Sequence, residues 1–94
     1  MALVNFYSIE TVDMSEAEVK RSLEDRGLRI ADLARQLVRE YPLTIKSADS
    51  MLRDLIAGKR WFPQYAAWLK ENYQISVKRP DHLRPVRERM KIAA

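Results

Sequence analysis

Apolar residues recur at helical spacing in four successive segments of the chain, and polar residues fill the positions between them. The first segment, residues 15–26, has a narrow apolar stripe. Ser15 and Glu18 have the Ser-x-x-Glu spacing of a capping box, and Gly27 suits the left-handed position that ends a helix. The pattern predicts a helix that begins after Ser15 and ends before Gly27.

The second segment has a broader apolar face that is interrupted by a proline. Because the residue before a proline avoids the helical region, Pro42 ends the pattern. We expect a helix from about Ile30 to Glu40 or Tyr41. Its apolar positions are Ile30, Leu33, Ala34, Leu37 and Val38.

Residues 42–46 are predicted to form a loop before a third helix. Ser47 is a favourable N-cap, so we expect this helix to cover about residues 48–57. Gly58 follows directly and is predicted to end it.

The fourth segment begins at Pro63, a residue that is favoured in the first turn of a helix, and the predicted helix covers about residues 63–73. The chain before the first helix has a different composition. Residues 2–9 are rich in strand-forming side chains, so they either pair with an extended piece at 75–78 or form an arm.

The chain has 94 residues, which is enough for one domain with short tails. We therefore expect an all-α fold with four helices in a helix-turn-helix arrangement. The predicted divisions are an N-terminal arm or short strand at 1–14, a helical domain at 15–77 and a basic C-terminal tail at 78–94.

Charge is distributed unevenly between the domain and the tail. Residues 1–77 contain eleven Lys or Arg and eleven Asp or Glu, so they are neutral. Residues 78–94 contain six basic and two acidic residues, and they carry the whole net charge of +4. A basic tail beside a neutral domain suits a polyanionic partner, although a solvated terminus has the same composition.

Several chemistries have no support in the sequence. The chain has no cysteine and one histidine, His82, so it lacks the residues for a disulfide or a thiolate metal site. We find no nucleophile–base arrangement and no Gly-rich phosphate loop, and we expect no enzyme activity, cofactor, metal or small-molecule substrate. No apolar run is long enough to span a bilayer, and the first residues lack a basic leader, so we expect no membrane partner and a cytoplasmic location.

Two stretches of the chain each contain a motif that is typical of a known family. Residues 27–37, GLRIADLARQL, place a glycine turn before a Leu-Ala pair and a later leucine, and residues 52–60, LRDLIAGKR, end a helix with Gly-Lys-Arg. Together with residues 65–75, these stretches span residues 27–75, about half of the chain, and they resemble the lambda-repressor-like (Cro/repressor, XRE-type) helix-turn-helix family. In that family, the alanine lets the two helices of the motif approach closely.

The resemblance implies a sequence-specific, double-stranded DNA-binding transcriptional regulator, in particular a homodimeric repressor of the phage or mobile-element type. The third predicted helix would enter the major groove, where exposed side chains near its N-terminus contact base edges. The candidates for base contacts are Ser47, Asp49, Ser50 and Arg53. The candidates for phosphate contacts are Arg29, Lys46, Lys59 and Arg60.

Two other functions also fit the sequence. A helical protein-interaction module, antitoxin-like or a phage adaptor, is favoured by the neutral charge of residues 1–77 and by the acids Asp49 and Asp54. An RNA-binding protein would use Trp61 and the basic tail. We expect Trp68 and Tyr73 to belong to the core, whereas Trp61 packs either on its own domain or on a partner subunit.

Overall fold

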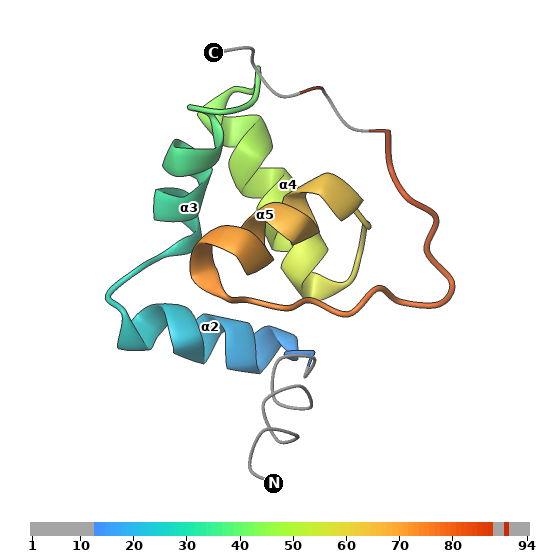
Figure 1. Cartoon of the computed structure of the whole chain (residues 1–94), viewed down its shortest axis with the longest axis horizontal. Helices are drawn as coiled ribbons and strands as arrows, with labels where there is room; N and C mark the ends of the chain where they lie inside the picture. Colours follow the sequence, from blue (N-terminus) through green and yellow to red (C-terminus); the bar gives the residue numbers. More distant parts are fainter. Residues whose placement is uncertain (1–12, 88–89, 91–94) are drawn as a thin grey trace, which may run out of the picture.

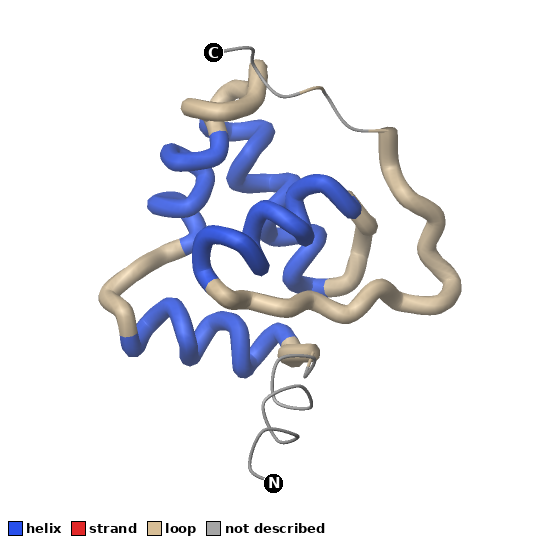
Figure 2. The backbone as a smooth tube through the Cα atoms, in the orientation of Figure 1, coloured by secondary structure: helices blue, strands red, loops and turns tan. Residues whose placement is uncertain are grey.

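The computed structural model describes residues 13–87 and 90, and within that part of the chain the regular structure is entirely helical (Figures 1 and 2). The helices are α2 (Glu16–Asp25), α3 (Ile30–Leu37), α4 (Ile45–Ala57) and α5 (Pro63–Tyr73). The predicted all-α class with four helices is therefore confirmed for these residues. The predicted strand or arm at 2–9 lies outside them.

One hydrophobic core joins the helices. Figure 1 shows α2 across one end of the domain and α3 along one side, and the most extensive contact between two helices is that of α3 with α4. The core contains residues from each helix and from the segments between and after them. Its buried members are Val19, Leu23, Ile30, Leu33, Ala34, Leu37, Tyr41, Ala48, Leu52, Leu55, Ile56, Phe62, Tyr65, Trp68, Leu69 and Ile75.

The start of α2 has the predicted capping box. The Ser15 hydroxyl accepts a hydrogen bond from the Glu18 backbone N–H at 3.2 Å, and the Ser15 N–H donates to the Glu18 carboxylate at 3.0 Å. At the other end Gly27 has a φ of 70°, and the Leu28 N–H donates to the Leu23 carbonyl at 2.8 Å. Both ends of this helix were therefore predicted correctly by local sequence signals.

The end of α3 was predicted too late. The helix stops at Leu37, and the chain continues through turns rather than reaching Glu40 or Tyr41 as a helix. The backbone N–H groups of Arg39 and Glu40 donate to carbonyls only three residues earlier, at 3.1 and 3.0 Å. This tighter pattern ends the regular ladder and brings the Tyr41 side chain into the core.

The start of α4 was also misplaced, because Ser47 is not its N-cap. The N-cap is Thr44, whose hydroxyl accepts from the Ser47 backbone N–H at 3.1 Å. The helix therefore begins at Ile45, one turn earlier than predicted, and Ser47 lies inside its first turn. Gly58 ends it as predicted, with a φ of 77°.

The chain after α5 pairs first with the segment before α2 and then with the α4–α5 loop. The Met14 N–H donates to the Ser76 carbonyl at 2.7 Å, and Met14 and Val77 form an isolated parallel bridge. Further along, Figure 1 shows the chain (orange to red) passing around the side where the α4–α5 loop lies. Among residues 13–87 and 90, no helix has the length and apolarity needed to cross a membrane.

The N-cap of α4 can be tested by a pair of substitutions. Thr44→Ala removes the acceptor for the Ser47 N–H, and we expect the free energy of unfolding to fall by about 1 kcal/mol. Ser47→Ala is the matched control and should change it by less than about 0.5 kcal/mol, because only its backbone N–H takes part in the cap. Urea unfolding of the two variants measures both effects, and a larger loss in Ser47→Ala would contradict the assignment of Thr44.

The capping box of α2 makes stability depend on pH. Hydrogen bonds from the Ser15 backbone and then its side chain hold the pKa of the Glu18 carboxyl below its ordinary value of 4.5. Because the folded pKa is the lower one, this contribution is complete above the ordinary value and is lost as the pH falls through the folded value. We expect the advantage of the native chain over Glu18→Gln to shrink as the pH falls from about 6 to 3.

Urea unfolding at a series of pH values measures this difference. Glu24→Gln, which changes an exposed acid on the same helix, is the control for a general charge effect. A difference between native protein and Glu18→Gln that stays constant down to about pH 3 would contradict the coupling.

Candidate nucleic-acid interface

The outward face of α4 is polar and carries most of the predicted base-contacting residues. Its inner face is fixed by four buried residues, Ala48, Leu52, Leu55 and Ile56. Helical spacing then places Lys46, Ser50 and Arg53 together on the opposite face, and all three are exposed, as is Ser47 nearby. The structure therefore presents three of the four candidate base-contacting residues to solvent.

The fourth candidate, Asp49, lies beside this face and holds Arg53 in place. Its Oδ2 accepts a hydrogen bond from the Arg53 Nε at 2.7 Å, while its Oδ1 is buried without a hydrogen-bond partner. The Asp49 side chain is 28% exposed and that of Arg53 is 57% exposed. Because a guanidinium has five N–H donors, Arg53 keeps donors for an external acceptor while Asp49 restricts its orientation.

Asp54 and Arg60 form a second internal pair at the end of α4. The Arg60 Nε donates to the Asp54 carboxylate at 2.7 Å, and the guanidinium lies 5.1 Å from the centre of the Phe62 ring. The Lys59 backbone N–H also donates to the Asp54 carbonyl, at 2.8 Å. Through these contacts, Arg60 fixes the α4–α5 loop to the end of α4. The adjacent Lys59 side chain stays exposed.

Arg29, another candidate phosphate contact, lies at the start of α3. It is the N-cap residue, and its backbone N–H donates to the Asp32 carboxylate at 2.9 Å. Asp32 also pairs with Arg35 at 2.8 Å and lies 3.9 Å from the Arg29 Nε. The Arg29 side chain is nevertheless 81% exposed, so it extends from the surface at this corner of the domain.

Two adjoining hollows connect these side chains. One, of about 260 Å³, lies between α2 and the C-terminal half of α4, and the other, of about 330 Å³, continues along α2 to the start of α3. The residues common to both are Lys20, Ile30 and Arg53. Lys59 lines the first hollow and Arg29 the second, so the fold brings cations from four segments to one surface.

Lys20 was missed by the sequence analysis. It pairs with Glu16 one turn away at 3.3 Å, and in sequence the two are indistinguishable from an ordinary solvated helix face. Only the packing of α2 against α4 places Lys20 beside Arg53. Three carboxylates also line the hollows, those of Glu16, Glu24 and Asp54.

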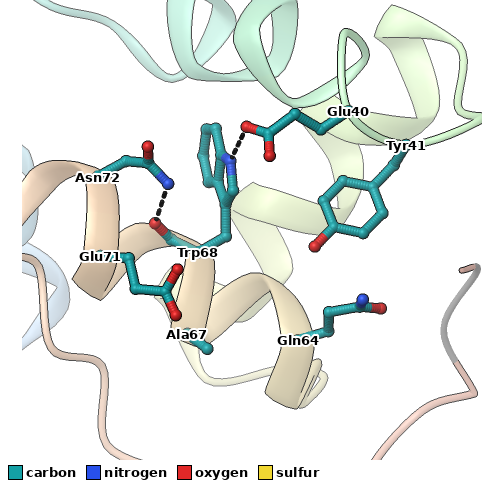
Figure 3. A pocket seen from close by; sticks show the side chains of 7 residues that line it. All are labelled: Glu40, Tyr41, Gln64, Ala67, Trp68, Glu71 and Asn72. Atoms are coloured by element: carbon teal, nitrogen blue, oxygen red, sulfur yellow. Dashed lines mark hydrogen bonds between the residues drawn. The ribbon is translucent and has the colours of Figure 1, made fainter. Parts of the chain in front are cut away.

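A separate hollow of about 330 Å³ has the opposite character (Figure 3). Its walls are the turn that follows α3 on one side and helix α5 on the other. The charged residues that line it are Glu40 and Glu71. The Trp68 indole N–H donates to the Glu40 carboxylate at 2.6 Å, which fixes that carboxylate at the edge of the ring. With two acids and no cation in its lining, this hollow does not suit a polyanion.

The aromatic residues are mostly structural. Trp68 is buried as predicted, and Tyr73 is half-buried with its ring 5.4 Å from that of Trp68. Trp61 is also half-buried, and it packs against the core of its own domain. In the part of the chain that the structure describes, no group of three or more His, Cys, Asp or Glu side chains is placed to hold a metal ion.

The chain matches no protein-family model, no curated protein and no solved structure, so the geometry of the candidate interface is the ground for any functional proposal.

Proposed function

We propose that this protein binds double-stranded DNA as a transcriptional regulator, with α4 in the major groove. The observation that carries the proposal is the exposed face of Lys46, Ser50 and Arg53 on a helix whose two acids each accept a hydrogen bond from an arginine. An unpaired acid on this face would repel phosphates. Because Asp49 pairs with Arg53 and Asp54 pairs with Arg60, that repulsion is reduced. The face that remains exposed bears cations and hydroxyls.

The dimensions and surroundings of α4 support this role. The major groove admits one α-helix when a neighbouring helix supports it, and α3 packs closely against α4. Lys20, Arg29 and Lys59 flank the outward face through the two hollows. Cations in these positions suit phosphate contacts, which orient a protein on the duplex while Arg53 and Ser50 contact bases.

A single module of this size covers a limited length of duplex. We therefore propose that two copies bind two half-sites about one helical turn apart, as a homodimer in the cytoplasm. Repression, by occupying a promoter, is the regulatory mode that the resemblance to the lambda-repressor-like family favours.

Selection from random duplex oligonucleotides with the purified chain tests the proposal directly. We expect an enriched motif with two related half-sites and binding that weakens steeply with salt. Absence of duplex binding even at about 50 mM salt would refute the function.

Arg53 should contribute to sequence choice. We expect Arg53→Ala to weaken binding to the selected site by about 1–3 kcal/mol and to relax the preference at one base position. Lys59→Ala is the contrasting variant, because a phosphate contact should weaken all sequences about equally and lower the salt slope by about 0.9. Fluorescence anisotropy with the selected site and single-base variants separates the two effects, and an unchanged preference in Arg53→Ala would contradict the placement of α4.

The acidic hollow favours a second candidate function, a helical protein-interaction module. Glu40 and Glu71, together with the rings of Tyr41 and Trp68, offer a setting for a basic side chain of a protein partner. A gel-shift titration separates the two functions. Binding to duplex DNA at low salt supports the regulator, whereas its absence supports the interaction module.

A further inference from the structure

We propose that residues 78–87 form a strap, docked on the α4–α5 loop, whose cations bind the phosphate backbone of duplex DNA beside α4. The proposal rests on the proposed DNA-binding function. It assigns a position and a ligand to this segment. From the sequence alone, the segment fits either a tail that binds a polyanion or a solvated terminus. Three sets of contacts and one charge pattern carry it.

The far end of the strap is attached to Trp61. The Val86 N–H donates to the Trp61 carbonyl at 2.8 Å, and Trp61 and Pro85 form an isolated parallel bridge. Both the Trp61 and Val86 side chains are partly buried against the core. A main-chain hydrogen bond combined with apolar burial fixes this end of the strap to the loop.

The near end lies beside Gly58, the C-cap residue of α4. A Cβ atom added at Gly58 would lie 3.5 Å from the Pro80 Cγ, at van der Waals distance, so the Pro80 ring lies next to the glycine. Between the two attachments, the Leu83 N–H donates to the Pro80 carbonyl at 3.1 Å and closes a turn. Arg79 reinforces that turn, since its Nε and Nη2 donate to the Leu83 carbonyl at 3.1 and 2.9 Å.

The strap holds cations that no acid in the described part of the chain neutralises. Lys78, Arg84 and Arg87 are exposed, and no described acid lies within ion-pair distance of them. Lys59 on the loop has the same property. Cations held close together raise the local positive potential and repel one another. A bound polyanion lowers the electrostatic free energy of this arrangement.

The strap is continuous with the candidate interface. Lys59 lines the same hollow as Arg53, and Pro80 lies next to its neighbour Gly58. A duplex that lies along α4 would therefore meet the strap at the C-terminal end of the helix. Because the strap is already ordered, its cations would bind phosphates with a smaller loss of conformational entropy than a free tail.

A double substitution tests the charge contribution. In Arg84→Ala/Arg87→Ala, two phosphate contacts are lost, and we expect the slope of log affinity against log salt to become shallower by about 1.8. The selected base motif should not change. Arg39→Ala/Lys70→Ala removes two exposed cations that line neither hollow, and this control should leave the slope unchanged.

A charge-neutral pair tests the docking. Val86→Pro removes the N–H that donates to Trp61, whereas Val86→Ala keeps this N–H and loses most of the side chain. We expect Val86→Pro to bind duplex DNA about two- to tenfold more weakly than Val86→Ala, the range that one net hydrogen bond provides. Circular dichroism of both variants monitors the helical domain.

The outcomes separate the two proposals. If the native chain does not bind duplex DNA, both are overturned. If it binds and Arg53→Ala alters the motif, an unchanged salt slope in the double variant overturns the strap alone. Equal affinities of Val86→Pro and Val86→Ala overturn the docking, because a free tail would contribute its charge without that hydrogen bond.

Discussion

The burial of the apolar face of α4 against α3 is the constraint on which the other features depend. Ala34 on α3 and Ala48 on α4 are both fully buried, and their small side chains allow two helices to pack closely. Leu52 and Leu55 complete the inner face of α4. Once this face is fixed toward the core, the 3.6-residue period decides which residues lie outside, about half a turn away.

The polar surface of the domain is organised by short-range ion pairs. Asp32, Asp49 and Asp54 each bond an arginine at 2.7 or 2.8 Å, and each pair lies within one helix or between a helix and the loop that follows it. Such exposed pairs contribute little to stability, so their main effect is on orientation and local charge. They restrict the orientations of Arg35, Arg53 and Arg60 and reduce the repulsive effect of the three acids.

The two chain segments that flank the helical domain are held to it by backbone hydrogen bonds. Met14 bonds to Ser76 next to α2, and Val86 bonds to Trp61 at the other side of the fold. Backbone donors and acceptors near an apolar surface favour such pairing, because burial without a partner is costly. The positive charge of the C-terminal segment is thereby given a defined position next to the end of α4.

The sequence by itself determined the features that depend on neighbouring residues. Ser15 and Glu18 lie three residues apart and cap α2 wherever it packs, and Gly58 ends α4 because glycine adopts a positive φ without steric cost. The apolar periodicity likewise identified the helices and their inner faces. These signals act over one helical turn, so they can be recognised without knowledge of the fold.

The tertiary structure decided what depends on residues far apart in the chain. Thr44 and Ser47 are both suitable caps, and burial of Tyr41 and Ala48 selects the earlier start of α4. The position of Lys20 beside Arg53 depends on how α2 packs. The hydrogen bond from Val86 to Trp61 joins a main-chain N–H to a main-chain carbonyl. Nearly every residue has both groups, so no side-chain pattern in the sequence predicts this bond.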